Sequence, residues 1–465
     1  MNKNNLGALA LILTLAGSVT RVQAADAEAG EALLKKLYLK LSTVLLNYND
    51  EAPKNVLFTF ANPGIGLPEK PNMNNKAEAE ILLSLADDQI LPGPVAVKTG
   101  GRLSDAYNHV LLNKVSARTE LTKDEQEKLN ALLDLVKADG TAMQKYNDLE
   151  DDYVAASTKL AIAQQADAVM AAKTKADGSS ADSKISKAEI YKKEVARALR
   201  LWQTDGRRDA IDAAFGKIRE YDNKDQSAWW ERLVTTYNLG LDQFKNRLAV
   251  FNPKPADWNK NSGWVKFSFS SNEASDSSKN SSRDISAAAS INVGKFGFSG
   301  SGGNSLKEGN TASKSMESTI EFELKRVFIS RPWLDVNVFK SHGWKFNDNF
   351  SKDFLSSGET LQDAQNGKAR MPMLTESLIL IRNLVVTGGL AEDMTNFRKE
   401  TTKAKAKIKY GPFFSANASY EKTDEAEGSS HKESQASITS EEMQVIGFIS
   451  TFLPKAPDPN PDIKW

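Results

Sequence analysis

Hydrophobic positions follow a helical period in the first half of the chain and a period of two in the second half. Up to about residue 250, apolar residues recur every three or four positions, which is typical of amphipathic helices. After a Pro-rich stretch at 252–255, apolar and polar residues alternate, as in strands with one buried face. The pattern predicts an α+β protein of several domains. It has an N-terminal antiparallel helical bundle or hairpin, followed by a β-sandwich or curved antiparallel sheet.

The first half contains clear signs of helix starts. Residues 31–46 place leucines and valines at helical spacing. Thr122 and Glu125 form a capping box, in which each side chain can bond a backbone amide that the helix leaves unpaired. A long helix is expected from there to about residue 173, with Gly140 as its weak point.

Three further features divide the rest of the helical half. Residues 54–70 contain several Pro and Gly, which favours a loop or a short strand. A second capping box at 186–189 opens another helix, and Asp205-Gly206 interrupts it. A last helix is expected from about Trp229 to Leu248. Long helices joined by short turns favour an antiparallel bundle or stalk.

The second half contains an apparent duplication. Residues 291–298 resemble residues 408–415, and the Phe-Ile-Ser triplet at 328–330 recurs at 448–450, which is 120 residues later. Repeated matches at a near-constant spacing indicate a structural unit used twice. The two units span about 264–335 and 377–455, and each has a predicted leading strand, at 264–271 and 377–388.

A glycine occupies the same place in each unit. Residues 285–293 and 404–410 each alternate with one apolar face, and the alternation changes register at Gly294 and at Gly411. A glycine at a register change is typical of a β-bulge, because the extra residue needs unusual backbone angles. The sequence therefore predicts a bulged strand in each unit.

The N-terminus has the pattern of a secretory signal peptide. Lys3 precedes an apolar run from Leu6 to Val19, and small residues lead to a cleavage point before Ala25. We expect a bacterial protein that is exported to the periplasm or secreted. The expected division of the chain is a signal peptide at 1–24, a mixed and mostly helical region at 25–120, a long-helix bundle or stalk at 121–252, the duplicated β-domain at 253–455, and an extended Pro-rich tail at 456–465.

Composition narrows the function. The chain has no cysteine, so that stability must come from packing instead of disulfides. Its 60 basic and 60 acidic residues balance, which argues against a nucleic-acid binder, since such proteins have a basic excess. None of the three histidines has a second histidine at metal-ligand spacing, and no nucleophile motif is present. The sequence thus predicts no enzymatic activity, no catalytic or metal residues and no cofactor.

Two groups of residues are candidates for ligand binding. Arg331 lies next to Trp333, with Trp344 nearby, and an Arg–Trp pair can bind a sugar, a lipid headgroup or a cation. The alternative is a tryptophan that closes one end of the β-structure, with Arg331 paired to an acid. The second group is a face of alternating lysines formed by Lys403, Lys405, Lys407 and Lys409. This face can meet anionic lipid or polysaccharide, or it can protect an exposed sheet edge from aggregation.

Three functions are compatible with these patterns. The first is a non-enzymatic interaction or structural protein that binds a surface, lipid or glycan through its β-domain. Its partners would be anionic lipid, glycan, another envelope protein or further copies of itself. The second is a β-pore-forming protein that inserts its two alternating segments, which are long enough to cross a membrane as strands and resemble the inserting hairpins of pore-forming toxins. The third is an exported polysaccharide hydrolase whose acids are brought together only by the fold.

Overall fold

We describe a computed structural model of the chain. It describes residues 32–46, 55–117, 121–177, 187–224, 226–272, 318–358, 369–391 and 436–463, together with short pieces at 287, 408–410, 412–415, 419–422 and 465. The predicted signal peptide, the first copy of the repeated sequence at 291–298, and both predicted bulge glycines lie outside these residues.

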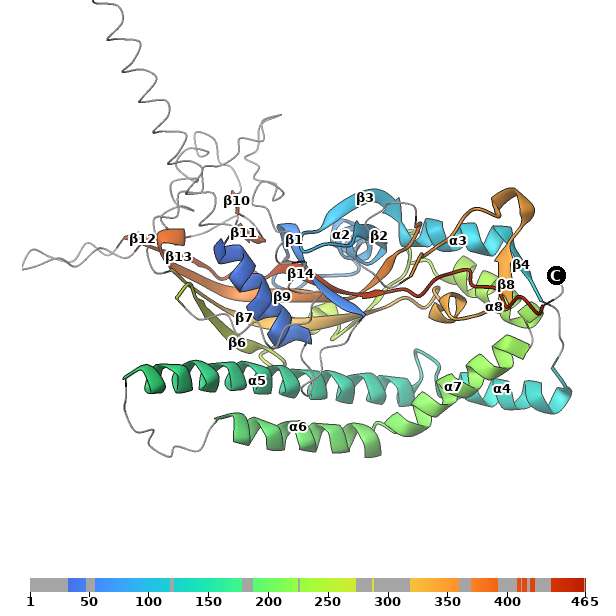
Figure 1. Cartoon of the computed structure of the whole chain (residues 1–465), viewed down its shortest axis with the longest axis horizontal. Coiled ribbons are helices and arrows are strands. Elements are labelled where there is room, and N and C mark those ends of the chain that lie inside the picture. The colour runs from blue at the N-terminus through green and yellow to red at the C-terminus, as the bar shows by residue number, and fades with distance from the viewer. Residues whose placement is uncertain are drawn as a thin grey trace, which may run out of the picture.

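One antiparallel sheet of eight strands organises the molecule (Figure 1). Helices pack around it, so the chain belongs to the mixed α+β class. The strands are β1 (Val56–Gly66), β5 (Val250–Asn252), β6 (Val265–Ser270), β7 (Ser318–Ser330), β9 (Met373–Gly388), β12 (Ser419–Lys422), β13 (Ala436–Ser440) and β14 (Gln444–Phe452). Because β1 and β5 belong to this sheet, the sheet extends beyond the predicted β-domain of residues 253–455.

Strand β9 is the centre of the sheet. β7 pairs with it on one side, while β14 and then β13 pair with it on the other. β1 lies outside β14, β12 lies outside β13, and both β5 and β6 lie outside β7. A bulge interrupts β9 at Asn383, which has a φ of 54° and hydrogen-bonds Glu323 on β7. Asn is one of the few residues that tolerate this backbone region, so it replaces the glycine expected at a bulge.

Both faces of the sheet are buried, although the alternating sequence predicts one buried and one polar face. Ile379 and Ile381 of β9 contribute to an apolar cluster on one face, and Leu378 and Leu380 contribute to a second cluster on the other. An antiparallel sheet often leaves one face in water. Here the helices and loops cover both, which explains why β9 and β14 consist almost entirely of buried residues.

A helix over residues 32–46 covers the first face, as the leucine spacing predicts. Its Leu37, Leu41 and Leu45 are almost completely buried in the first cluster. Two lysines of the helix reach the outer strand β6. Lys36 donates to the backbone oxygen of Ser271 at 3.0 Å, and Lys40 donates to that of Ser268 at 2.6 Å. These bonds satisfy carbonyl groups that the edge of a sheet leaves unpaired.

The region 55–117 alternates between strands and helices. After β1 it forms α2 (Lys76–Asp87), β2 (Asp88–Leu91), β3 (Val97–Arg102), α3 (Leu103–Asn113) and β4 (Lys114–Ser116). Asn75 caps α2 by accepting two backbone N–H groups, and the buried side of α2 joins the second cluster. The loop or short strand predicted at 54–70 is the strand β1.

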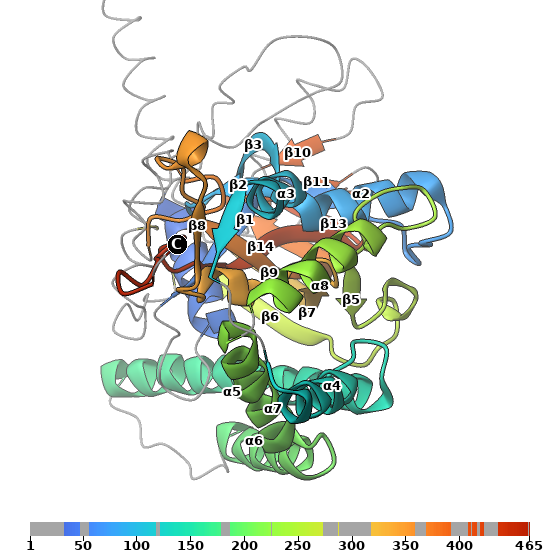
Figure 2. The same cartoon turned by 90° about the vertical axis from the view of Figure 1, so that its right-hand side faces the viewer.

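Helices α4 (Lys123–Leu135), α5 (Thr141–Asp177), α6 (Lys187–Thr204) and α7 (Arg208–Lys224) form a layer below the sheet (Figures 1 and 2). The capping box of Thr122 and Glu125 is confirmed, since both reciprocal hydrogen bonds are present. The single helix predicted to continue to residue 173 is wrong. The helix is interrupted over residues 136–140, and Gly140, which has a low helix propensity, is the last residue before α5 begins.

The last helix, α8 (Gln226–Leu239), is shorter than predicted. It stops before Gly240, where an added Cβ would collide with the Cβ of Trp333. The following residues, up to Leu248, loop back under Trp333 instead of continuing the helix. Long-range packing with a tryptophan more than 90 positions later in the chain therefore determines this end.

The two predicted units lie side by side in the one sheet. The first contains β6 and β7, and the second contains β9, β13 and β14. Phe328 and Ile449 both lie opposite Ser377 of β9, so the repeated triplets occupy nearly the same level on either side of that strand. The triplets are displaced by one residue, which puts Phe328 and Phe448 on opposite faces.

Short strands follow on either side of the second predicted bulge. Strands β10 (Ile408–Tyr410) and β11 (Phe413–Ser415) pair antiparallel, with Tyr410 opposite Phe413. Gly411 itself lies outside the described residues, so the bulge at this glycine stays a prediction.

The end of the sheet near the C-terminus is built from short elements. These are η4 (Val336–Phe339), β8 (Trp344–Phe346) and η5 (Asp348–Phe350), with β8 paired to β4, whereas η1 (Pro255–Asp257) lies between β5 and β6. A third apolar cluster fills this end, with Trp229, Trp230 and Tyr237 of α8 at its centre. The C-terminal tail is extended, and Ala456 exchanges backbone hydrogen bonds with Leu355 and Ser356.

Candidate functional site

The aromatic candidates for ligand binding lie inside the protein. Trp333 and Trp344 are 1% and 0% exposed, and both belong to the third apolar cluster. The indole N–H of Trp333 donates to the backbone oxygen of Leu248 at 2.8 Å, and that of Trp344 donates to Val338 at 2.9 Å. Since buried tryptophans normally find such a partner, these two side chains have the surroundings of core residues. They close one end of the sheet, as the alternative interpretation predicts.

Arg331 is also buried. Its Nε donates to the backbone oxygen of Ala86 at 2.8 Å. Burial lowers the pKa of its guanidinium to about 10, and the negative charges of Asp87 and Glu376 act in the opposite direction. The arginine therefore links α2 to the sheet and offers no exposed group to a ligand.

The lysine face cannot be placed as a whole. Lys403, Lys405 and Lys407 lie outside the described residues. The backbone of Lys409 belongs to β10, opposite Phe414. Ligand binding by this face remains a prediction.

The end of the sheet opposite the tryptophans brings the two alternating segments together. Ser270, Thr319, Thr387 and Ser437 form one row across four neighbouring strands, each paired with the next. The segment 271–317 connects β6 to β7, and the segment 389–435 connects β9 to β13. The two segments are equal in length and leave the same end of the sheet. The alternating pattern of the two segments can be recognised in the sequence. That both segments begin and end at the same end of the sheet follows only from the strand order.

Described residues of both segments are buried in one place. Ala287 of the first segment is 0% exposed and belongs to the first apolar cluster. Phe413 of the second segment is 2% exposed and joins the same cluster, with its ring centroid 6.4 Å from that of Phe322 on β7. Apolar side chains from each segment are therefore stored against the face of the sheet that the helix 32–46 covers.

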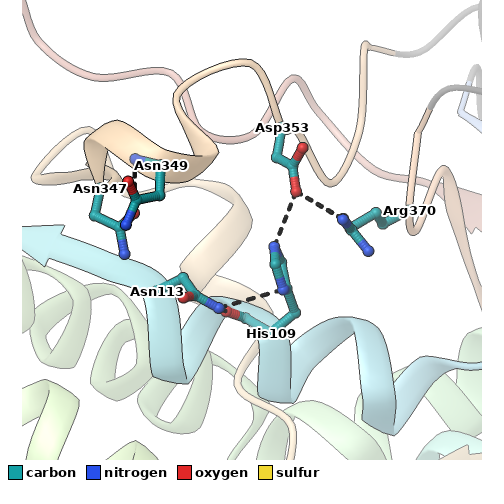
Figure 3. Close-up of polar contacts among 6 residues, drawn as sticks. All are labelled: His109, Asn113, Asn347, Asn349, Asp353 and Arg370. Atoms are coloured by element: carbon teal, nitrogen blue, oxygen red, sulfur yellow. Dashed lines mark hydrogen bonds and ion pairs between the residues drawn. The ribbon is translucent and has the colours of Figure 1, made fainter.

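A polar cluster lies at the tryptophan end (Figure 3). His109 on α3 lies 3.0 Å from Asp353 through its Nε2, and Arg370 donates to the same carboxylate oxygen of Asp353 at 2.7 Å. The side-chain amide of Asn113 lies 3.3 Å from Nδ1 of His109. No sequence signal predicts this cluster, because Asp353 is 244 positions from His109.

The cluster is a structural link between two elements of the fold. Both ring nitrogens of His109 already have a hydrogen-bond partner. To take a proton from a substrate, the histidine would first have to lose one of these partners. Burial by itself raises the pKa of Asp353, but the hydrogen bond and charge of Arg370, and then those of His109, outweigh it and lower this pKa. A stable carboxylate thus ties α3 to the loop after η5.

A second charged cluster lies where α5 meets the sheet. Glu150 of α5 faces Asp212 and Arg208 of α7 and Glu376 of β9, and burial, followed by these carboxylates, raises the pKa of Glu150 to about 7. Burial and the neighbouring Asp152 likewise raise the pKa of Asp151 to about 6, against the charge of Lys325. The sequence around these acids is typical of a solvent-exposed helix face, and only tertiary packing buries them.

Neither cluster has the composition of a metal centre. Among the residues that the structure describes, no three His, Asp or Glu side chains come together as metal ligands. In the same part of the chain, no helix is both long enough and apolar enough to cross a membrane.

Comparison of the chain with protein-family models, with curated proteins and with solved structures finds no match.

Proposed function

We propose that this protein is a non-enzymatic, exported protein that binds anionic membranes and inserts the segments 271–317 and 389–435 into them as β-hairpins, forming a pore. The observation that carries the proposal is the row of Ser270, Thr319, Thr387 and Ser437 across four strands. From this row, the segment 271–317 can extend the pair of β6 and β7. The segment 389–435 can extend the pair of β9 and β13 once β12, which belongs to this segment, has left the edge of the sheet.

The sequences of the segments suit that extension. Residues 285–293 and 404–410 alternate between an apolar and a polar face. A strand needs about 9–11 residues to cross a bilayer, so residues 285–293 reach this length and residues 404–410 need at least two more residues of their segment. One lipid-facing side is enough because the other side faces water. Paired strands also satisfy their backbone hydrogen bonds, which is the strongest requirement inside a membrane.

The buried residues of the segments explain how the apolar faces are kept from water before insertion. Ala287 and Phe413 pack into the first apolar cluster. On insertion these side chains would exchange protein contacts for lipid contacts, which changes the hydrophobic free energy little. The lysines at 403–409 would first draw the second segment to an anionic surface, at about 1 kcal/mol for each lysine near it.

The test uses the absence of cysteine from the chain, since each introduced cysteine is then unique. Four variants, A289C, S290C, A406C and K407C, are labelled with a dye whose emission depends on polarity and are mixed with anionic liposomes. We expect a blue shift for the labels at Ala289 and Ala406, little change at their neighbours, and release of trapped dye from the liposomes. Ser351→Cys, an exposed position at the other end of the sheet, is the matched control.

Two outcomes would contradict insertion. Equal responses at neighbouring positions would show that the segments do not cross the membrane as strands. Binding to liposomes without release or blue shift would instead identify a protein that binds a surface through its β-domain.

A further inference from the structure

A cleft of about 500 Å³ opens at the tryptophan end of the molecule. Its walls are β8, the loop around Asp353 and the C-terminal tail, all at the opposite end of the sheet from β12 and β13 (Figure 1). This volume falls within the range of small-molecule sites, which is about 300–1,000 Å³. The cleft therefore has no part in the insertion proposed above.

The walls of the cleft are fixed by hydrogen bonds from several elements. The backbone N–H of Asn347 donates to Asn113 of α3 at 2.9 Å, and Asn347 caps η5 through its side chain. The His109–Asp353–Arg370 cluster holds the loop that follows (Figure 3). Ala456 fastens the tail to Leu355 and Ser356. A site held in this way loses little conformational entropy when a ligand binds.

Three lysines from separate segments converge on the cleft. They are Lys345 of β8, Lys352 of the loop and Lys455 of the tail. Lys455 forms an exposed ion pair with Asp458 at 3.0 Å, and such pairs contribute little. Within the described part of the chain, no ion pair involves Lys345 or Lys352. Lys345 also has a cation–π contact, with its Nζ 5.2 Å from the ring centroid of Trp465. Three lysines in the lining of one cleft favour an anionic ligand.

The same cleft also has features that suit a hydroxyl-rich ring. Phe354 and two prolines of the tail line it with partly exposed apolar surface, which can pack against the carbon face of a sugar, whereas Phe346 is only 3% exposed and forms the floor. The lining carboxylates of Asp348 and Asp353 can accept hydrogen bonds from hydroxyl groups but would repel a ligand with many negative charges. Arg370 and His109 contact only Oδ2 of Asp353, and no hydrogen bond to its Oδ1 is present among the described residues.

From these features we infer that the cleft binds a saccharide carrying a single carboxylate or sulfate group. The anionic group lies among Lys345, Lys352 and Lys455. The ring packs on Phe354 and the prolines of the tail, and a hydroxyl donates to Oδ1 of Asp353.

The experiment measures binding by calorimetry and by saturation-transfer NMR, with glucuronate, glucose 6-sulfate and glucose as probes. We expect at least one of the two anionic sugars to bind and glucose to bind about tenfold more weakly. Lys352→Gln and Lys455→Gln should each weaken the anionic sugar by about fivefold, as expected for one partly exposed ion pair. Lys70→Gln, at an exposed position outside the cleft, is the control and should change nothing.

Each result decides the matter. If neither anionic sugar binds, or if glucose binds equally well, the assignment of the ligand is wrong. If an anionic sugar binds but the K352Q/K455Q double variant binds it as tightly as the unmodified protein, the site lies elsewhere. Thermal melting of each variant confirms that a loss of binding is not a loss of fold, because both lysines are at the surface.

Discussion

Glu150→Gln should stabilise the protein at neutral and alkaline pH. The side chain of Glu150 lies between α5, α7 and β9, where burial and the carboxylates of Asp212 and Glu376 raise its pKa from 4.5 to about 7, against the charge of Arg208. Glutamine keeps the shape of the side chain and removes its charge. The substitution therefore isolates the free energy of holding this carboxylate between the helical layer and the sheet.

The pKa shift determines both the sign and the size of the effect. Between about pH 4.5 and pH 7 the folded protein retains a proton that the unfolded chain has lost, so the free energy of unfolding falls as the pH rises through this window. At about 1.36 kcal/mol for each pH unit, the full shift corresponds to roughly 3 kcal/mol. Because the side chain is only partly buried by surface area, we expect about 1–2 kcal/mol.

The assay is urea unfolding of the unmodified protein and of the E150Q variant at several pH values from 5 to 8. The variant should match the unmodified protein near pH 5 and exceed its stability by about 1–2 kcal/mol at pH 8. Glu127→Gln, on the exposed side of α4, is the matched control and should change stability by less than about 0.5 kcal/mol at every pH.

One result would refute this reasoning. If E150Q is no more stable than the unmodified protein at pH 8, or if both proteins have the same pH dependence, Glu150 is not held in a desolvated acidic site. A stabilisation by E150Q that is present at pH 5 and absent at pH 8 would be the opposite of the expected pH dependence.

Four further substitutions test the packing and the local bonds. Gly240→Ala should destabilise the fold by about 1–3 kcal/mol in thermal melting, because its Cβ would collide with Trp333, whereas Gly216→Ala has room and should stabilise α7 by about 0.5–1 kcal/mol. Thr122→Ala should cost about 1 kcal/mol in urea unfolding through loss of the capping box. The lowered pKa of Asp353 stabilises the fold above the pKa of the unfolded chain, and this stability is lost as the pH falls, so Asp353→Asn should cost up to about 1 kcal/mol at pH 7 and little near pH 3.

Each of these has a contrary result. Equal effects of the two glycine substitutions would show that Trp333 does not limit the end of α8. A neutral Thr122→Ala would mean that water replaces the cap without cost. A loss in Asp353→Asn that is as large at pH 3 as at pH 7 would show that its charge is not the stabilising feature.

The parts of the fold that depend on neighbouring residues could be predicted from the sequence. The helix at 32–46, the capping box of Thr122 and the strands β6 and β9 all follow from spacing and local hydrogen bonding. The break at Gly140 lies at the position that helix propensity marks as weakest. Local interactions are sufficient to predict the structure wherever the competing conformations differ in helix propensity or in a helix cap.

The parts that depend on distant contacts could not be predicted. Gly240 ends α8 because Trp333 occupies the space that a continued helix would need. From the sequence, Trp333 is a candidate binding residue, because the sequence of an Arg–Trp pair is the same whether the pair lies in a core or on a surface. The cluster of His109 and Asp353 joins residues that no spacing rule connects, and the shared exit of the two segments follows only from the strand order.

The pairing of β1 with β14 has a consequence for how the chain is made. Val56 lies opposite Thr451, so the first strand of the sheet pairs with β14, which is synthesised nearly 400 residues later. Such distant pairing is slow, because a large loop must close before any contact compensates for the lost entropy. Until β14 emerges, β1 and the helix at 32–46 have no complete core to join. A chain with this order cannot complete its sheet until β14 has been synthesised.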